Sequence, residues 1–319
     1  MSKQLKKTNV PAPAQPDQRK EPLPWHRPKS SNEDPLCPSK LQAILESPSY
    51  IPAVEDIDFL GGNESRGVRL QLDYLKPEKL LRQYNVQYTI VVFGSTRIVE
   101  PAVAQQKVER LRSELLTDAS NKDIQRKLLV AERILVKSHY YEVAREFSQL
   151  VAKSGDGPID SRLVVITGGG PGVMEAANRG ANDAGGKTIG LNITLPHEQY
   201  PNPYVTPELC FQFHYFSIRK MHFVLRARAL VAFPGGFGTF DELFETLTLI
   251  QTRKIKPMPV VLVGEAFWRK AFDVDFLVDE GVIDAEDREL FWFAETADDV
   301  WSGLQNWYER NGETLIPEN

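Results

Sequence analysis

Residues 229–242 read ALVAFPGGFGTFDE, and this stretch decides the predicted fold. Its first five residues form a continuous apolar run, which is typical of a strand buried on both faces of a parallel sheet. Pro234 and a cluster of glycines end the run, and a helix-forming segment follows from Thr239. The order strand, glycine-rich turn, helix suits a phosphate cradle, because free backbone N–H groups at a helix start attract anions.

The same alternation of strand and helix extends in both directions along the chain. Apolar runs predict strands at Thr89–Gly94, Leu163–Thr167, Thr188–Ile193, Leu209–His214, Ala229–Phe233 and Pro259–Gly264. Helices are predicted at Leu70–Tyr84, Ala104–Leu115, Asp123–Lys153, Gly172–Ala184, Ser217–Arg228, Thr239–Arg253, Ala266–Glu280 and Ala297–Arg310. This order predicts an α/β fold, a Rossmann-like doubly wound parallel sheet with helices on both faces and ligands at the carboxyl ends of its strands.

Composition predicts how the chain is organised. Residues 1–52 are rich in Pro, Lys, Gln, Ser and Glu and lack apolar periodicity, so we expect a disordered or loosely docked arm, with Lys40–Glu46 as a short helix. Residues 53–319 are expected to form a single domain, in which 98–153, rich in charge and helix formers, is a helical insertion.

Charge and cysteine content exclude several classes of protein. A net charge of −5 argues against a broad nucleic-acid surface. The 2 cysteines and 5 histidines show no spacing typical of a metal site, so we expect no metal. No apolar run is long enough to cross a bilayer, and no apolar stretch follows the lysines of residues 1–20 as it would in a secretory signal. We therefore expect a cytoplasmic protein without membrane association.

Two further loops leave the same edge of the predicted sheet. Phe93–Arg97 places Gly94 and Ser95 at a strand exit, followed by a further hydroxyl and a cation, which suits an anion or ribose, although for this loop alone an ordinary Gly/Ser turn is the favoured interpretation. Residues 167–175, TGGGPGVME, place four glycines within five positions before a helix. A purely structural turn rarely needs so many, so this loop is interpreted as functional.

Two nucleotide-binding motifs do not fit. The dinucleotide fingerprint fails in the second loop, because Val173 stands where its third glycine belongs and residues 191–193 lack the acidic group that would hold a ribose. Gly186-Lys187-Thr188 mimics the end of a P-loop, but it lacks the leading glycine and enters a strand.

Glu242 has two interpretations. Thr239-x-x-Glu242 matches a capping box, in which the glutamate only completes the helix start, and Asp241 there would favour the helix dipole. The density of glycines before it favours a functional carboxylate instead. Upstream, Ser217 is predicted to cap a helix on which Arg219, His222 and Arg226 share one face that can turn toward an anion.

These loops resemble those of the LOG ("Lonely guy") family of nucleoside 5′-monophosphate phosphoribohydrolases, which older descriptions often label lysine decarboxylases. The resemblance rests on residues 168–175 (GGGPGVME), 219–221 (RKM) and 234–242 (PGGFGTFDE), which contain the family's PGG-x-GT-x-x-E pattern, and it covers roughly residues 87–310. The arm and the insertion at 98–153 depart from the short plant-like members, and residues 191–204 are more similar to the larger bacterial members, for which AMP or a broader set of nucleotides is a better expectation than cytokinin nucleotides alone.

The resemblance implies a hydrolase that cleaves the N-glycosidic bond of a nucleoside 5′-monophosphate, giving free base and ribose 5-phosphate, with no metal or cofactor. It makes Arg219 and Glu242 the catalytic pair. It makes Gly235, Gly236, Gly238 and Thr239 the phosphate-binding turn. Other candidate substrate-binding residues are Gly94, Ser95, Gly169, Gly170, Gly172, Met174, Glu175, Asn192 and Lys220. The family's sites lie close to a dimer interface, which implies a homodimer or larger homo-oligomer.

Two rival functions remain open from the sequence. A nucleotide-binding sensor without chemistry would keep the glycine turns and tolerate loss of Arg219 or Glu242. A decarboxylase would need a lysine Schiff base with pyridoxal phosphate, for which Lys220 is the lysine beside the predicted site.

Overall fold

The computed structural model describes residues 20–22, 27–196 and 200–316, and the chain divides into two compact units, residues 1–66 and 67–319. In the first unit lie α1 (Cys37–Leu45), η2 (Pro48–Tyr50) and α2 (Ile57–Gly61). Ser65 is the only buried residue among those described in this unit, so its helices have no apolar core of their own. Residues 1–19 and 23–26 of the predicted arm lie outside the described residues, and its loose docking stays a prediction.

The second unit is built on a single sheet. Its strands are β1 (Tyr88–Phe93), β2 (Leu163–Thr167), β3 (Thr188–Ile193), β4 (Cys210–Phe213), β5 (Ala227–Ala232), β6 (Val260–Val263) and β7 (Trp292–Ala294). They form a 7-stranded sheet in the order β4-β3-β2-β1-β5-β6-β7, and every neighbouring pair is parallel. The predicted doubly wound parallel sheet is confirmed. Strand β7 was not predicted, because three residues are too few to show an apolar pattern.

Helices cover both faces of this sheet. The helices of this unit are α3 (Arg66–Gln83), α4 (Pro101–Thr117), α5 (Lys122–Lys137), α6 (His139–Ala152), α7 (Val173–Asp183), α8 (Phe216–Leu225), α9 (Phe237–Gln251), α10 (Glu265–Ala271), α11 (Val274–Asp279) and α12 (Ala297–Arg310), with short turns η3 (Pro207–Leu209) and η4 (Ala285–Leu290), and all but α4 and α5 lie close to the sheet. Alternate side chains of β1 separate the two cores. Ile90 and Val92 pack with α6, α7 and α12, whereas Val91 and Phe93 pack with α3, α8, α9 and α10.

The order of the strands creates a crevice between β1 and β5. From β1 the chain steps outward through β2, β3 and β4, and then returns to place β5 on the other side of β1. The loops that follow β1 and β5 therefore leave the sheet in opposite directions. Such a switch point is where open α/β sheets bind ligands.

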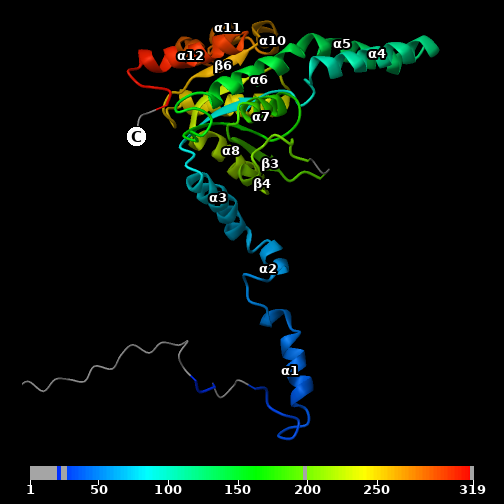
Figure 1. Ribbon diagram of the computed structural model, residues 1–319, viewed down its shortest axis with the longest axis vertical. Coiled ribbons are helices and arrows are strands. Elements are labelled where there is room, and N and C mark those ends of the chain that lie inside the picture. The colour runs from blue at the N-terminus through cyan, green and yellow to red at the C-terminus, as the bar shows by residue number, and fades with distance from the viewer. Residues whose placement is uncertain (1–19, 23–26, 197–199, 317–319) are drawn as a thin grey trace, which may run out of the picture. The chain divides into compact units, whose positions relative to one another are not determined.

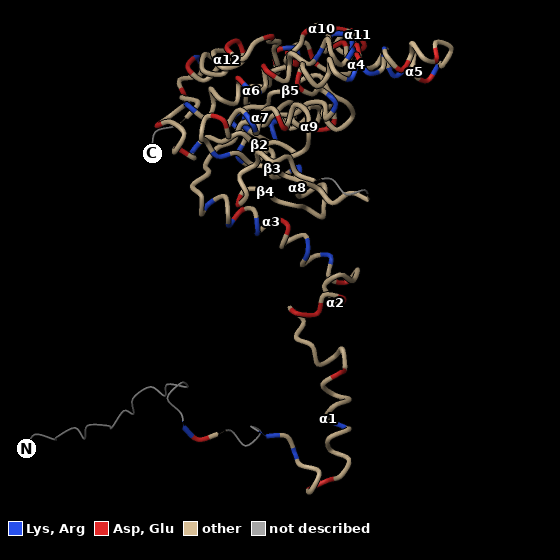
Figure 2. Tube along the Cα trace, turned by 45° about the vertical axis from the view of Figure 1, so that its right-hand side comes forward, with Lys and Arg blue, Asp and Glu red and all other residues tan. Residues whose placement is uncertain are grey.

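The predicted insertion contains three helices with different roles. The predicted single helix Asp123–Lys153 breaks at Ser138 into α5 and α6. Tyr141 and Phe147 of α6 are fully buried against the sheet, so α6 belongs to the core of the unit. Helices α4 and α5 instead form a hairpin that extends away from the sheet and carries charges of both signs along its length (Figures 1 and 2).

Helix α3 holds α8 at both of its ends. Asp73 Oδ2 accepts hydrogen bonds of 2.9 Å from the backbone N–H groups of His214 and Tyr215 at the start of α8. At the other end, buried Glu78 forms a bidentate ion pair with Arg226. The predicted cap Ser217 is wrong, because Tyr215 is the N-cap and no side chain caps this helix, while Asp73 holds the two residues that lead into it.

The predicted basic face of α8 divides between two partners. Arg226 pairs with Glu78, and His222 is buried beside the same carboxylate, with its ring 5.5 Å from that of Tyr74. Only Arg219 of the three basic residues lines the cavity described below. The prediction that all three turn toward one anion is therefore wrong for His222 and Arg226.

Replacing Glu78 with Gln would leave the Arg226 guanidinium buried without its counter-charge. We expect the free energy of unfolding at pH 7 to fall by roughly 3 kcal/mol. The hydrogen bond from Arg226, opposed by burial, holds the pKa of Glu78 below its ordinary value of 4.5. A depressed pKa gives stability that is present above the unfolded value and lost as pH falls through the folded value. The deficit of the variant should therefore shrink below about pH 4.5.

Urea denaturation at pH 7 and pH 4, followed by circular dichroism, measures both effects. Glu313→Gln is the matched control, because Glu313 pairs with Arg228 at the surface with 56% of its side chain exposed. An equal deficit for Glu78→Gln at both pH values would contradict the assignment.

Candidate active site

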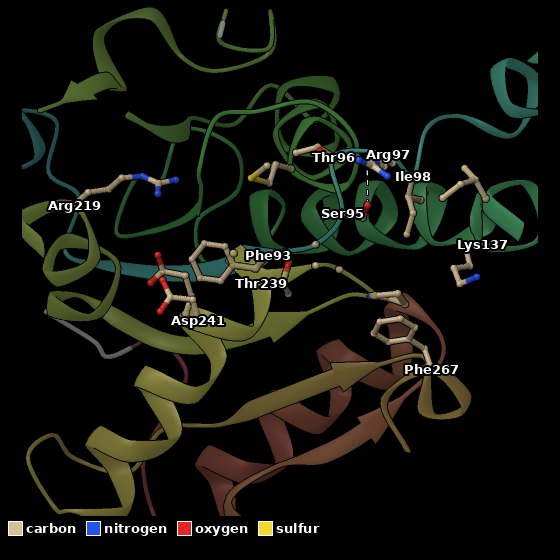
Figure 3. A pocket seen from close by; sticks show the side chains of 18 of the residues that line it. Phe93, Ser95, Thr96, Arg97, Ile98, Lys137, Arg219, Thr239, Asp241 and Phe267 are labelled. Atoms are coloured by element: carbon tan, nitrogen blue, oxygen red, sulfur yellow. Dashed lines mark hydrogen bonds between the residues drawn. The ribbon is translucent and has the colours of Figure 1, made fainter. Parts of the chain in front are cut away.

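A cavity of about 580 Å³ opens at the carboxyl ends of β1 and β5. Its lining comes mainly from three places, namely the loop after β1, the glycine turn after β5 with the start of α9, and Arg219 from α8 (Figure 3). Of the predicted site residues, it brings together Gly94, Ser95, Met174, Arg219, Gly235, Gly236, Gly238, Thr239 and Glu242. The volume is within the range of small-molecule sites.

Ser95 ties the loops of the site together through its backbone. Its N–H donates to the carbonyl oxygen of Pro234 at 3.0 Å, and its carbonyl oxygen accepts from the N–H of Val173 at 3.2 Å. The close approach requires Gly172, which has a φ of +73° and whose Cβ, if present, would collide with the Ser95 carbonyl. The loop after β1 is therefore wedged between the glycine turn and the start of α7.

The turn after β5 presents a row of free backbone donors. Within the described residues, the N–H groups of Gly235, Gly236, Phe237 and Gly238 form no hydrogen bond. Helix α9 begins at Phe237, so its N-terminal dipole adds positive potential at the same place. Backbone donors at a helix start are the arrangement that binds a phosphate group.

The capping-box interpretation of Glu242 is wrong. The N-cap of α9 is Gly236, which makes Thr239 the third residue of the helix, and no side chain caps this helix. The Thr239 N–H donates instead to the Gly236 carbonyl oxygen at 3.0 Å. Glu242 therefore lies in the second turn, where its carboxylate is free for another role.

Glu242 is a buried carboxyl group in the wall of the cavity. Its side chain is 6% exposed and, among the described residues, it forms no hydrogen bond or ion pair. Burial raises the pKa of Glu242 to about 7, and the charges of Lys220 and Arg219 offset that effect only in part. At neutral pH the group is thus divided between its protonated and ionised forms, a state suited to acid–base chemistry.

The Arg219 side chain extends to the cavity and is held in place by its neighbours. Its Nε donates to the Leu191 carbonyl oxygen at 2.7 Å, and its guanidinium lies 5.1 Å from the centre of the Phe223 ring. Burial lowers the pKa of Arg219 and the charge of Glu242 opposes that effect, yet an arginine remains protonated at any physiological pH. The fixed Nε leaves the terminal nitrogens to face the cavity.

Gly168 makes this position of Arg219 sterically allowed. A Cβ on Gly168 would lie 2.7 Å from the Arg219 Nη2 atom and 3.0 Å from the Met174 sulfur. The sequence did not single out Gly168 within its glycine run, because nothing in the run indicates which glycine faces the arginine.

Lys220 lies outside the cavity, on the far side of α9. Its Nζ atom forms ion pairs with Asp241 at 2.9 Å and with Glu245 at 2.8 Å. Burial alone would lower the pKa of Lys220, but these two carboxylates raise it, so the amine is held protonated. A Schiff-base lysine needs a neutral amine facing the ligand, and this geometry argues against a decarboxylase role for Lys220.

The remaining predicted residues pack the loops against one another and do not line the cavity. The carbonyl oxygens of Gly169 and Gly170 accept from Asn202, and Asn192 lies against Gly169. Glu175 accepts a hydrogen bond of 3.0 Å from Tyr141 of α6. Their contact with a ligand stays a prediction.

Several lining residues were not predicted. They are Ile98, Ile134, Lys137, Phe216 and Phe267, whereas Phe93, Thr96, Arg97, Pro234 and Asp241 lie in the loops Phe93–Arg97 and Phe233–Glu242, which the sequence already offers as candidates for ligand contact. The sequence gives no sign of a site at Lys137, because this residue lies at the end of a charged helical segment with no motif around it. Only the path of α5 past the loop after β1 brings it to the site.

Comparisons with known proteins identify what this chain is similar to. A family model described as "Possible lysine decarboxylase" matches residues 174–304. A probable cytokinin riboside 5′-monophosphate phosphoribohydrolase of Oryza sativa subsp. japonica is 28% identical over 174 residues, which cover 54% of this chain and 67% of the relative. The chain is similar to this LOG enzyme over about half of its length. A second LOG relative, a cytokinin riboside 5′-monophosphate phosphoribohydrolase of Arabidopsis thaliana, is 26% identical and covers 56% of this chain and 80% of its own.

The solved structures similar to this chain include a Moco carrier protein and a molybdenum cofactor binding protein. The Moco carrier protein from Chlamydomonas reinhardtii is 21% identical with a TM-score of 0.40, covering 70% of this chain and 99% of its own. The molybdenum cofactor binding protein from Rippkaea orientalis is 22% identical with a TM-score of 0.37, covering 53% of this chain and 87% of its own.

The buried carboxyl group of Glu242 should reduce the stability of the protein. Its pKa is raised from 4.5 to about 7, so the folded state holds a proton that the unfolded state releases, and stability falls as pH rises through this window. Glu242→Gln keeps the shape and removes the charge. We expect the variant to gain about 1–3 kcal/mol in unfolding free energy at pH 8 and little at pH 4.5.

Urea titrations at pH 4.5 and pH 8 measure the difference. Glu245→Gln, one helical turn further on and ion-paired with Lys220, is the matched control and should show no gain at pH 8. A Glu242→Gln variant less stable than the parent at pH 8 would show that the carboxylate is not strained in the folded protein.

Proposed function

We propose that this protein hydrolyses the N-glycosidic bond of nucleoside 5′-monophosphates, with AMP or a related purine nucleotide as substrate. The observation that carries the proposal is the buried Glu242 carboxyl group, with its pKa of about 7, in one cavity with the Arg219 guanidinium and the free donors of the turn after β5. Similarity to two LOG phosphoribohydrolases supports the same reaction.

The turn after β5 would bind the 5′-phosphate. Four successive N–H groups, from Gly235 to Gly238, have no partner among the described residues and can donate to its oxygens. The Thr239 hydroxyl is buried beside them in the cavity wall. Binding at the phosphate fixes the orientation of the ribose without touching the bond that breaks, which is how remote binding energy contributes to catalysis.

The ribose would then lie toward Glu242 and Arg219. Water adds its oxygen to C1′ of the ribose, the bond from C1′ to the base nitrogen breaks, and the water proton ends on the departing base. Positive charge develops on the ribose as the bond breaks, as in other glycoside hydrolyses. The Glu242 carboxylate stabilises that charge or accepts the water proton, while Arg219 positions the nucleotide.

An exposed apolar surface beside the cavity supports a homodimer or larger homo-oligomer. Phe237 is 96% exposed at the first position of α9, and Phe216, Met221 and Phe244 are exposed nearby on α8 and α9. Clustered large apolar side chains at the surface are typical of protein–protein contacts. A second copy of the chain on this surface is the occupant that we propose, in a cytoplasmic enzyme without a metal.

Purified protein incubated with AMP or a cytokinin riboside 5′-monophosphate tests the reaction, with free base and ribose 5-phosphate as the products to detect. Glu242→Gln should lower kcat by about 100-fold or more, whereas Glu245→Gln should stay within about threefold. Tight nucleotide binding with no product from a panel of bases would favour the nucleotide sensor instead.

The pH profile provides a second expectation. If Glu242 acts as the carboxylate, kcat/KM should rise with pH and level off above an inflection near 7. The substrate phosphate also ionises near pH 6. The pH dependence of AMP binding to Glu242→Gln isolates that contribution, because this variant lacks the titrating carboxyl. A profile that falls through pH 7 would assign Glu242 the role of an acid.

Gly168→Ala should displace Arg219 without disturbing the fold. The added methyl group would lie 2.7 Å from a terminal nitrogen of that flexible side chain, so the arginine must move. We expect kcat to fall by about tenfold or more while Tm changes by no more than about 2 °C. Gly67→Ala, where no atom lies within 4 Å of the new methyl, is the control. Full activity in Gly168→Ala would argue against a catalytic position for Arg219.

A further inference from the structure

The charged residues that line the cavity are unevenly distributed. The two carboxylates, Asp241 and Glu242, are consecutive on α9. Figure 3 shows Asp241 on the same side of the cavity as Arg219. The other two lining cations, Arg97 and Lys137, come from the loop after β1 and the end of α5, and Lys137 lies at the end opposite Arg219 (Figure 3). One end of the cavity is thus mixed in charge and the other is purely cationic.

Neither cation of this second end has a counter-charge. Among the described residues, Arg97 and Lys137 form no ion pair, and the Lys137 amine donates only to the Arg133 carbonyl oxygen of its own helix, at 3.1 Å. Elsewhere around the site the cations are compensated. Lys220 has two carboxylates within 3 Å, and the Glu242 charge acts on Arg219. Two cations without counter-charges in a concave site attract an anionic ligand.

The walls beside these cations are apolar. Ile98 is buried, and Ile134 and Phe267 line the cavity next to it. Walls of low polarity weaken the screening by water, so the attraction of Arg97 and Lys137 for a phosphate is stronger here than on an open surface. The side chains of Arg97 and Lys137 are long enough to adjust to the position of a bound anion.

Between the two ends lie the donors that we assign to the 5′-phosphate. Thr239 and Ser95 are central in Figure 3, with Arg219 on one side of them and Lys137 on the other. With the ribose directed toward Glu242, a bound nucleotide turns its phosphate toward Arg97 and Lys137. These two cations then lie beyond the first phosphate, in the direction in which a second phosphate extends.

We propose that Arg97 and Lys137 form a subsite for a second phosphate, so that the cavity accepts nucleoside 5′-diphosphates as well as monophosphates. The orientation of the ligand rests on the proposed function, while the presence of an anion subsite does not. The end of the α4–α5 hairpin thereby becomes a determinant of ligand length. Guanidinium and ammonium groups form charge-assisted hydrogen bonds with phosphate oxygens, which are about twice as strong as neutral ones.

The alternative for Lys137 is a structural role, in which its ammonium group interacts with the C-terminus of its own helix. Lysines in the last turn commonly do so, and the hydrogen bond to the Arg133 carbonyl oxygen is of that kind. In that case its removal would weaken α5 slightly and leave ligand binding unchanged. The two interpretations therefore differ in a binding measurement.

Isothermal titration of the full chain with AMP, ADP and inorganic pyrophosphate tests the subsite. We expect ADP to bind more tightly than AMP. In Lys137→Met and Arg97→Gln, the affinity for ADP should fall by about 10-fold or more, and that for AMP by less than about threefold. Lys127→Met, on the same helix but ion-paired with Asp123, is the control and should bind both ligands as the parent does.

Each other outcome counts for or against the subsite. Equal losses for AMP and ADP would assign the cations to a single phosphate, and no loss would leave Lys137 as a helix-end cation. Either result overturns the proposal. If AMP is neither bound nor hydrolysed but pyrophosphate binding still depends on Lys137 and Arg97, the nucleotide hydrolase fails and the anion subsite stands.

Discussion

The site depends on the backbone of Ser95. This residue follows β1 at the switch point of the sheet, and its peptide groups hydrogen-bond to the turn after β5 on one side and to the start of α7 on the other. Three segments that are far apart in sequence are thereby fixed within one hydrogen-bond length. Because these bonds use backbone atoms, the identity of the side chains around them can vary while the cradle keeps its shape.

The same site contains a group that lowers the stability of the folded protein, the buried carboxyl of Glu242. A carboxyl group that is buried without a hydrogen-bond partner disfavours its ionised form, and Arg219 and Lys220 restore only part of the lost solvation. Stability has been traded for a group that can exchange a proton near neutral pH, which is common at functional sites. Lys220, the residue after Arg219, does not line the cavity, and its amine is ion-paired with Asp241 and Glu245. Its charge is therefore felt by Glu242 without blocking the ligand.

The sequence predicts this fold well where physical signals are local. The six longer strands and the glycine turns follow from apolar runs and strand–helix order, and the helix Ala297–Arg310 agrees with α12 at both ends. Capping was mispredicted at Ser217 and left open at Glu242, because neither α8 nor α9 has a side-chain cap, and the segment before α8 is instead held by Asp73 from a distant element. Lys137 and Gly168 had no local signal, since only tertiary packing brings them to Arg219 or to the cavity.

The contacts of α3 with both ends of α8 have a consequence for how the protein is made. Glu78 and Arg226 are 148 residues apart, and Asp73 and Tyr215 are 142 apart. Contacts of such long sequence separation close large loops and form late in folding. During synthesis, the helix that carries Arg219 cannot be held at both ends until Tyr215 and Arg226 have followed α3 out of the ribosome. The glycine turn after β5 and Glu242 emerge directly afterwards, so the cavity cannot form before this part of the chain has been made.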